Sequence, residues 1–434
     1  MSAPSGQTPA LKALNCPGCG AAVTIRGLER TLSVVCEICH SILDAKHPSL
    51  RVLQQFEGTQ HFQPLIPLGS RGKVRGDAYE VIGFQVRTIY VEGVAYSWAE
   101  YLLFNPYKGF RYLTEYQGHW NDVKAVRSLP EVTQSGGKPA VRFLGETYKH
   151  FQTARATTTY VLGEFPWQVR VGDEVTVMDF VAPPRVLSSE TTEDEVTWSL
   201  GEYWTGAQVW EAFQLPGRPA GAMGVYANQP SPVKPKIRSI WAAALLLLAA
   251  LFALSQVVAI IARNEEVYSG RYSFQAGAVE GSYVTDVFEL KGRTSNVELS
   301  IRTDLANNWA FFNLALINDD TGEAYDFGRE VSYFSGRDSD GAWTEGSPGD
   351  TVYIPSVPPG RYYLRVEPDM APGARAMEYT LTLRRDVPRY SFFFIAALLV
   401  LVPPVFYSLR ALSFEHARWQ ESDYASSGEE DDDE

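Results

Sequence analysis

All four cysteines of the 434-residue chain lie within its first forty residues, in two C-x-x-C pairs. Cys16 and Cys19 form the first pair, and Cys36 and Cys39 form the second, a spacing typical of four-cysteine zinc sites. A C-x-x-C turn directs two thiolates at one ion, so two such turns complete a tetrahedral shell of sulfurs at about 2.3 Å. Because four protein ligands leave no position open for water, the pattern predicts a structural zinc ion.

Four cysteines in this pattern could also form two disulfides or a redox site. Disulfides are not expected, because the segment MSAPSGQTPALKALN before Cys16 has no apolar core of the kind that marks a secretory signal. A thioredoxin-type redox site uses a single C-x-x-C in a βαβ context, not two in tandem. His40 and His47 could also bind the metal, but four cysteines suffice and we expect both histidines at the surface. We therefore predict a flexible segment over residues 1–12 and a zinc ribbon over residues 13–50.

Two apolar stretches are long enough to cross a membrane. Residues 240–262, IWAAALLLLAALFALSQVVAIIA, contain no charge, and about 20 such residues span the hydrocarbon core. The second predicted span, residues 390–412, begins YSFFFIAALLVLVPPVFYSL. Its two adjacent prolines would kink the helix, which membrane helices tolerate when neighbours satisfy the freed carbonyls. The sequence thus predicts a two-pass membrane protein.

The charges beside these spans predict the orientation. Lys234, Lys236 and Arg238 precede the first span, which places the N-terminus in the cytoplasm by the positive-inside rule. Two spans then return the C-terminus to the same side. Three arginines between residues 384 and 389 argue for the reverse, but long segments translocate largely regardless of charge. A reducing cytosol also suits four metal-binding thiols.

The remaining segments are rich in strand-forming residues. Residues 51–214 alternate β-branched and aromatic residues with Gly and Pro, which predicts antiparallel strands in one or two small cytosolic barrels or sandwiches. Residues 215–239 form a Pro-rich linker, residues 263–389 an extracytoplasmic β-sandwich, and residues 413–434 an acidic cytosolic tail ending in EEDDDE. The expected fold class is therefore a mainly β multi-domain membrane protein.

Several phrases of the β region resemble a known family. These are LGSRGKVRGDAYEVIGFQVR, GVAYSWAEYLLFNPYKGFRYLTEYQGHW, VLGEFPWQVRVGDEV and WSLGEYW, and they look like the bacterial domain of unknown function 4178 (DUF4178). The resemblance implies a zinc ribbon and two membrane helices around this module, in the bacterial inner membrane and in a context of membrane stress. It implies no activity. The phrase VPPGRYYLRVEP is similar to jelly-roll or pre-peptidase sandwiches, which implies that fold for the outer segment.

The cytosolic β region offers few groups for catalysis. Glu80, Glu100, Glu115, Trp98 and Trp120 could line a cleft with paired carboxylates. The same alternation is equally that of the inner and outer faces of one sheet. No P-loop, nucleophile elbow, H-E-x-x-H or Ser-His-Asp pattern is present. We therefore predict no catalytic or cofactor-binding residue here.

Isolated groups elsewhere add little chemistry. His61, His119 and His150 stand alone in the sequence. Asp338 and Asp340 could supply hard oxygens to calcium, but the spacing of an EF-hand is absent and D-G favours a turn, which is what we expect there.

Net charge and layout bound the function. A formal charge of −13 argues against a nucleic-acid surface. Domains on both sides of a membrane suit communication or assembly, so we expect a non-catalytic scaffold or sensor that recruits cytosolic proteins. The same layout permits a homo-oligomer, and a nucleic-acid partner is not expected. The alternatives are an enzyme or enzyme accessory with a site in the cytosolic β region, and a subunit of an oligomeric transporter or channel.

Overall fold

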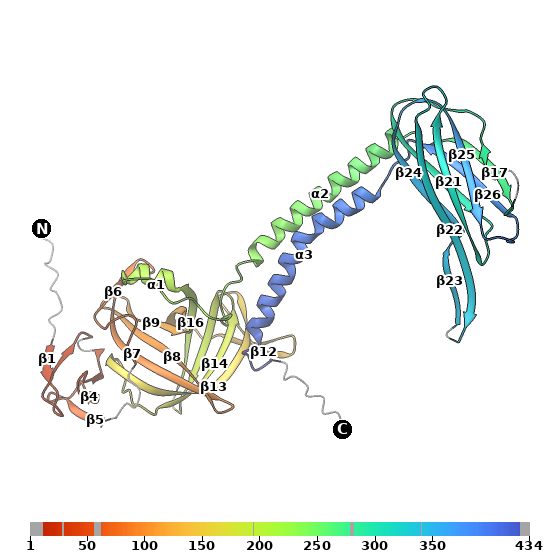
Figure 1. Cartoon of the computed structure of the whole chain (residues 1–434). Coiled ribbons are helices and arrows are strands. Elements are labelled where there is room, and N and C mark those ends of the chain that lie inside the picture. Colours follow the sequence, from red (N-terminus) through yellow and green to blue (C-terminus); the bar gives the residue numbers. More distant parts are fainter. Residues whose placement is uncertain are drawn as a thin grey trace, which may run out of the picture. The chain divides into compact units, whose positions relative to one another are not determined.

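The computed structural model describes residues 12–27, 30–55, 62–193, 195–277, 282–339 and 341–425. The predicted flexible segment, except Lys12, and the acidic run at residues 429–434 lie outside these ranges, as do His61 and Asp340. The chain divides into two compact units, one of residues 1–237 with 407–434 and the other of residues 238–406 (Figure 1). The prediction of a mainly β chain is confirmed.

The first unit is built on a closed barrel of eight antiparallel strands (Figure 1). Two four-stranded meanders meet at both edges, where β10 (His119–Ala125) pairs with β16 (Val196–Thr205) and β13 (Glu146–Phe165) pairs with β7 (Asp77–Val91). The strands between these are β8 (Val94–Asn105), β9 (Gly109–Tyr116), β14 (Glu174–Ala182) and β15 (Arg185–Thr191). Closure leaves no free edge among the eight strands, and a barrel of this size has an interior just wide enough for side chains or one small ligand.

The outer face of the barrel is covered by short elements. Helix α1 (Gly206–Phe213) begins with a capping box between Thr205 and Gln208 and buries Val209 and Phe213 against the Tyr101–Trp120 layer. Strand β6 (Arg71–Val74) pairs with β7 beneath it. A hairpin of β11 (Glu131–Ser135) and β12 (Lys138–Phe143) continues from β13 and covers Phe180. These contacts identify the face of Tyr101 as the outside of the barrel.

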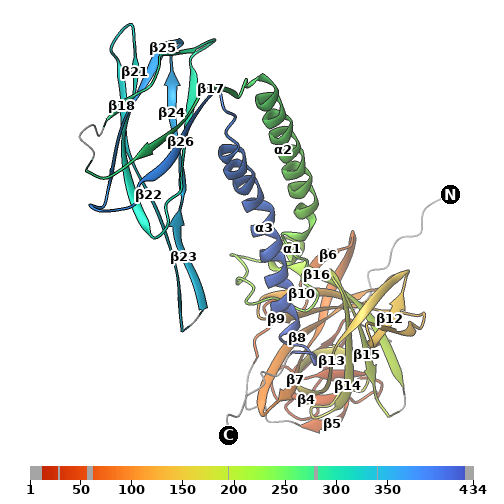
Figure 2. The same cartoon turned by 90° about the vertical axis from the view of Figure 1, so that its right-hand side faces the viewer.

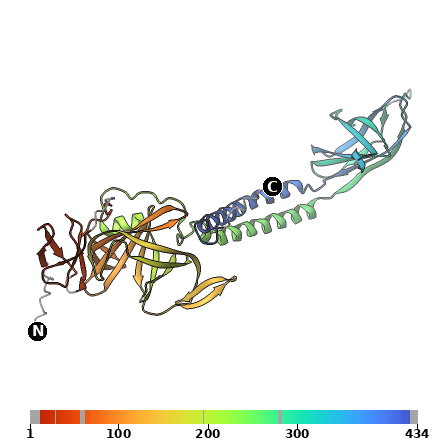
Figure 3. The ribbon, with the colours of Figure 1, turned by 90° about the horizontal axis from the view of Figure 1, so that it is seen from below.

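The N-terminal ribbon continues the barrel sheet (Figure 3, red against orange). Its first hairpin joins β1 (Lys12–Asn15) to β2 (Ala22–Ile25). Its second part is the three-stranded run β3 (Ser33–Val35), β4 (Ser41–Asp44) and β5 (Arg51–Gln55), in which β3 also pairs with the end of β13. Val35 and Ile42 pack with Leu102, Val161 and Phe165 in one buried cluster, so the ribbon is part of the barrel's core.

The second unit is a sandwich of two sheets around one apolar core (Figure 2). One sheet has the order β17-β26-β20-β24, and the other has the order β18-β25-β21-β22-β23, with β19 also on β25. The strands are β17 (Glu265–Phe274), β18 (Tyr283–Val284), β19 (Phe288–Leu290), β20 (Ser295–Thr303), β21 (Asn308–Asn318), β22 (Ala324–Asp338), β23 (Gly341–Ser347), β24 (Gly349–Val357), β25 (Gly360–Met370) and β26 (Met377–Arg385). The predicted β-sandwich is therefore present. Asp338 lies at the end of the β22–β23 hairpin, which fits the expected turn.

Two helices are long and apolar enough to cross a membrane, α2 (Lys234–Ile261) and α3 (Ser391–Trp419). Most of their apolar side chains are exposed, Leu246 and Phe394 among them, unlike those of a soluble core helix. Helix α3 runs past residue 412, where we predicted a solvated tail to begin. The difference arises because the residues from Trp419 to Tyr424 pack on the barrel, as described below.

Candidate metal centre

The structure brings the four cysteines together at the tip of the ribbon. The Sγ atoms of Cys16 and Cys39 are 3.6 Å apart, as are those of Cys19 and Cys36, and all four lie within 4.8 Å of one another. A tetrahedron with metal–sulfur bonds of about 2.3 Å has edges of roughly 3.8 Å, which these distances match. All four cysteines are free, so the pairs are not disulfides. The arrangement can hold one tetrahedral metal ion.

Two matching backbone turns position the sulfurs. The amide of Gly20 donates to the carbonyl of Cys16 at 2.8 Å, and the amide of His40 donates to the carbonyl of Cys36 at 2.9 Å. Both donors have positive φ, +79° at Gly20 and +54° at His40. His40 thus holds the place that glycine fills in the first turn. Among the described residues the metal-binding cluster contains cysteines alone, and His47 Nδ1 accepts from the amide of Ser49 instead.

The surroundings of the four thiols shift the pKa values of Cys39 and Cys36 in opposite directions. The Ser41 hydroxyl, 3.2 Å from Cys39 Sγ, and the Ser41 amide lower the pKa of the Cys39 thiol to about 6. Burial raises the pKa of the Cys36 thiol to about 12. A buried thiol of that kind ionises only beside a positive charge, and a bound divalent cation supplies it. The donor set therefore fits a metal such as zinc, held without an open coordination position.

Glu164 fixes the ribbon to the barrel. This carboxylate on β13 is 1 % exposed and accepts from the amides of Arg26 at 2.6 Å and Gly27 at 2.7 Å, and from the Thr31 hydroxyl at 2.9 Å. A Cβ at residue 27 would lie 2.4 Å from Thr31 Oγ1, so glycine is required for this close approach. Burial raises the pKa of Glu164, and the two amide donors offset part of that rise. The ribbon is thus held as a fixed part of the first unit.

Replacing Glu164 by alanine is expected to loosen the ribbon without removing its metal ligands. The change leaves three buried donors without an acceptor, at a cost of about 3 kcal/mol, which corresponds to roughly 100-fold faster local opening. Hydrogen exchange of the full chain should show faster exchange at Gly27 and along β3. A Glu37→Ala control, at an exposed position in the same ribbon, should leave the exchange unchanged. Equal exchange in both variants would refute this anchoring role.

The acidic and aromatic residues that could have lined a cleft are not gathered at one site. Glu100 pairs across the sheet with Thr114, whereas Glu115 pairs with Ala99, so the two carboxylates lie on opposite faces. Trp120 shares the outer face with Glu115 and stacks on Tyr101 in the core, and burial raises the pKa of Glu115. Glu80 is paired with Arg71 at 2.9 Å. Only Trp98 joins Glu100, donating to its carboxylate at 2.7 Å.

Glu100 belongs to a polar layer on the inner face of the barrel. Gln85 donates to its Oε2 at 2.6 Å, and Arg87 lies 3.7 Å from its Oε1 while binding Glu190 at 2.7 Å. Farther round the ring, Ser188 and Gln152 donate to Asp179, whose pKa burial raises. Sequence reasoning missed Arg87, Asp179 and Glu190, since they come together only when β13 closes on β7. The carboxylates of this layer serve as acceptors of hydrogen bonds and as partners of Arg87.

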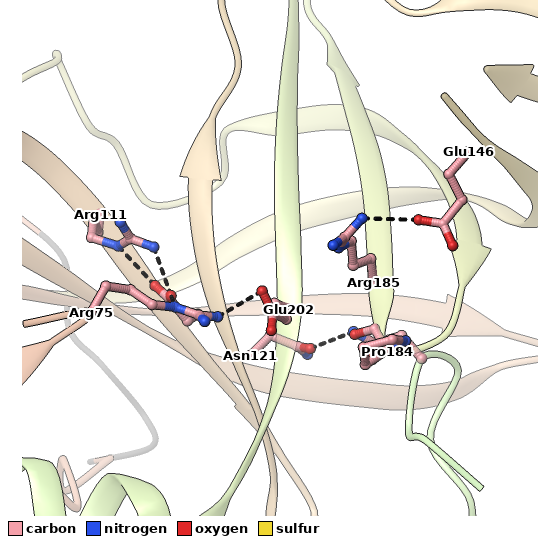
Figure 4. A network of polar contacts seen from close by, with 9 residues as sticks. Arg75, Arg111, Asn121, Glu146, Pro184, Arg185 and Glu202 are labelled. Carbon is pink, nitrogen blue, oxygen red and sulfur yellow. Dashed lines mark hydrogen bonds and ion pairs between the residues drawn. The ribbon is translucent and has the colours of Figure 1, made fainter. Parts of the chain in front are cut away.

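A second network ties strands together on the outer face (Figure 4). The carboxylate of Asp122, whose side chain is fully buried, accepts two bonds from Arg111, at 2.8 and 2.6 Å, and one from Arg75 at 2.9 Å. Arg75 also binds Glu202 at 2.8 Å. On the opposite face of β10, the side chain of Asn228 in the linker donates to Asn121 at 2.7 Å and to the Pro184 carbonyl at 3.1 Å. These contacts hold β10, β16 and the linker in place and have the geometry of structural ion pairs.

One family model matches part of the chain. Residues 67–206 match the family model described as Domain of unknown function (DUF4178). No curated protein matches. Among solved structures, a chain of infectious bursal disease virus, Gt strain, is 13 % identical with a TM-score of 0.18, covering 75 % of this chain and 77 % of that one. A glycoside hydrolase family 43 arabinoxylan arabinofuranohydrolase from Bacillus subtilis is 7 % identical with a TM-score of 0.14, covering 70 % and 79 %. Such low scores carry no argument about fold or function.

Proposed function

We propose that this chain is a non-catalytic bacterial membrane scaffold or sensor, in which a cytosolic metal-bound ribbon and barrel are coupled through two membrane helices to an outer β-sandwich. The match of residues 67–206 to the DUF4178 model supports the bacterial setting that the family resemblance implies. The closed four-cysteine cluster supports a structural zinc ion. The length and exposure of α2 and α3 support insertion in the inner membrane.

The first unit contains segments from before α2 and from after the membrane-spanning part of α3, and this supports the topology. Residues 1–237 and 407–434 form one compact body, so the chain leaves that body through α2 and returns to it through α3. Two segments of one body lie on the same side of any membrane that both helices cross. The lysines and arginine before α2 favour the cytoplasm for that side. Both termini are then cytosolic and the sandwich is extracytoplasmic.

The observation that carries the proposal is the clasp at the end of α3, which we define as Arg418 and the carbonyls that it binds. Arg418 is 1 % exposed and donates to the carbonyls of Tyr226 at 3.0 Å, Ala227 at 2.6 Å and Gln229 at 2.7 Å. Glu415, one turn earlier, accepts from Arg418 Nε at 3.0 Å. A guanidinium with this many partners is held in a single orientation. The second apolar helix therefore ends locked to the linker that leads into the first one.

Further contacts extend the clasp to the barrel wall. Beyond the helix, the Asp423 amide donates to the Phe151 carbonyl at 3.0 Å, and the Asp423 carboxylate accepts from the Thr153 amide at 2.9 Å. The Tyr424 hydroxyl lies 2.9 Å from His150 Nδ1. Both His150 and Phe151 lie on β13, the strand that also carries Glu164 and pairs with the ribbon.

Tyr226 connects the clasp to a second strand of the barrel, β10. Its ring stacks on His119 at 5.2 Å, and His119 Nε2 donates to the Met223 carbonyl at 2.8 Å. Burial lowers the pKa of His119, which favours the neutral ring in this stack. A shift of α3 would thus move residues bonded to both β10 and β13. That is the coupling a sensor or scaffold across a membrane requires.

Capture of partners from native membranes tests this function. The full chain would be cross-linked, extracted in mild detergent and purified, and the attached proteins identified. Ile38, 71 % exposed between two metal ligands, offers an apolar contact at the ribbon tip, so Ile38→Asp should lose cytosolic partners that the wild type retains. Tyr107→Asp, at the 93 % exposed Tyr107 in the β8–β9 turn, is the matched control and should retain them. Recovery of the wild-type chain alone would contradict a scaffold.

A further inference from the structure

A basic hollow lies where both apolar helices join the sandwich. It has a volume of about 240 Å³ and includes Ile261, the last residue of α2, and Asp386, which follows β26. Four basic residues line it, namely Arg263, Lys291, Arg293 and Arg385, against two acidic ones. We call this site the neck hollow.

Asp386 fixes the backbone around the neck hollow. Its carboxylate accepts from the Arg263 amide at 3.2 Å and from the Arg293 side chain at 3.1 Å, and its carbonyl accepts from the Asn264 amide at 3.1 Å. The next residue, Val387, exchanges two hydrogen bonds at 2.9 Å with the side chain of Asn296. The chain leaving α2 and the chain leading to α3 are therefore tied together here, which preorganises the surrounding side chains.

The two carboxylates of the hollow do not balance its four positive charges. Arg385 is 3 % exposed and donates to backbone carbonyls, among them that of Arg293 at 2.7 Å. Burial lowers the pKa of Arg385, and the nearby charge of Arg263 acts in the same direction. The Arg263 guanidinium lies beside Gly292, where a Cβ would be 3.3 Å from its Nη1. Asp386 already binds Arg293, and the other two arginines of the hollow repel each other.

We propose that the neck hollow binds the phosphate group of an anionic phospholipid at the outer surface of the membrane. This inference rests on the proposed membrane-spanning role of α2 and α3, since the end of a span lies at the depth of the lipid headgroups. Arginine side chains suit the task, because the guanidinium fork matches two oxygens of a phosphate. Free inorganic phosphate presents the same oxygens, so the test must separate the two sources.

The test uses the full chain purified in a zwitterionic detergent-lipid mixture containing phosphatidylcholine. Phosphatidylglycerol, further phosphatidylcholine or inorganic phosphate is then added, and bound lipid is counted by native mass spectrometry. We expect retention of phosphatidylglycerol, with about tenfold weaker binding in Arg263→Gln, since one charge-assisted contact is lost. Arg337→Gln, at an exposed arginine in β22 of the same sandwich, should bind as the wild type does. Lys291→Gln provides a second hollow variant should the first fail to fold.

Each result of this experiment either supports or refutes lipid binding by the neck hollow. Weaker binding in a hollow variant with an unchanged control supports it. Equal binding of the two lipids, or unchanged lipid binding in both hollow variants, overturns the lipid assignment. Binding of inorganic phosphate without any binding of phosphatidylglycerol overturns it as well. Alkaline carbonate extraction of the native membrane tests the spanning role separately. A chain that stays in the membrane but shows no preference for phosphatidylglycerol refutes only the hollow, whereas a chain released by carbonate refutes the proposed function.

Discussion

Replacing Cys36 by serine is expected to abolish metal binding and to unfold the ribbon. Cys36 is 1 % exposed, and a structural zinc site contributes on the order of 10–16 kcal/mol to the folding of such small modules. Metal content measured on the full chain should fall from about one ion per chain to about none. Hydrogen exchange should rise along β3 and β4, and it should also rise at Phe165, since Val35 and Ile42 pack against this end of the barrel.

His47→Ala is the matched control for that variant. His47 is an exposed histidine close to the second cysteine pair, and its ring does not join the cluster. The control should keep the metal and the protection of the ribbon. Wild-type protein that contains no metal while its ribbon amides remain protected would show that the four sulfurs are packed without an ion, and would contradict the assignment.

Replacing Arg418 by alanine is expected to release the end of α3 from the first unit. The change removes charge-assisted hydrogen bonds to three carbonyls, each worth about 1.5–3 kcal/mol, and leaves those carbonyls in a site without water. Amides near the clasp, those of Gln229 and Asp423 among them, should exchange at least about 100-fold faster. Arg418→Lys should be intermediate, because an ammonium keeps the charge but lacks the guanidinium fork.

Arg410→Ala serves as the control for the clasp. Arg410 lies on the same helix two turns earlier and is exposed. Exchange near the clasp should be unchanged in this variant, and barrel strands such as β8 should stay protected in both. Identical exchange in Arg418→Ala and the wild type would mean that the clasp does not hold α3, and the route for coupling would be lost.

The features that depend on residues close together in the sequence could be predicted from it. Two C-x-x-C pairs foretold the cysteine cluster, because each turn positions its own two sulfurs. Two uninterrupted apolar runs foretold α2 and α3, because length and hydrophobicity suffice for that prediction. Alternation in the region matched by DUF4178 foretold antiparallel strands, although whether they close into one barrel depends on the pairing of β13 with β7, far away in sequence.

Long-range contacts account for what the sequence did not reveal. Glu164 sits in the phrase LGEFPW and looks like any surface glutamate, yet it binds two amides of the ribbon. Arg418 precedes an acidic run typical of a solvated tail, yet it is buried by carbonyls nearly two hundred positions earlier in the chain. Glu100 and Glu115 look alike in their strands, and only the register shows that they face opposite ways. A basic residue in the last turn of a helix, ahead of an acidic end of the chain, was the available signal for Arg418.

The placement of the two units on opposite sides of a membrane is the central claim, and cysteine labelling in intact cells tests it most directly. One further cysteine would be introduced at each of two exposed positions, Ser339 in the sandwich and Ser128 beside the barrel, and the labelling of the wild type, which carries the four free ribbon cysteines, would be subtracted. A maleimide that cannot cross membranes would be added to intact spheroplasts and, separately, to lysed ones. We expect Ser339→Cys to be labelled before lysis and Ser128→Cys only after it. Labelling of Ser128→Cys in intact spheroplasts, or protection of both until lysis, would contradict a protein that joins the two faces of the membrane.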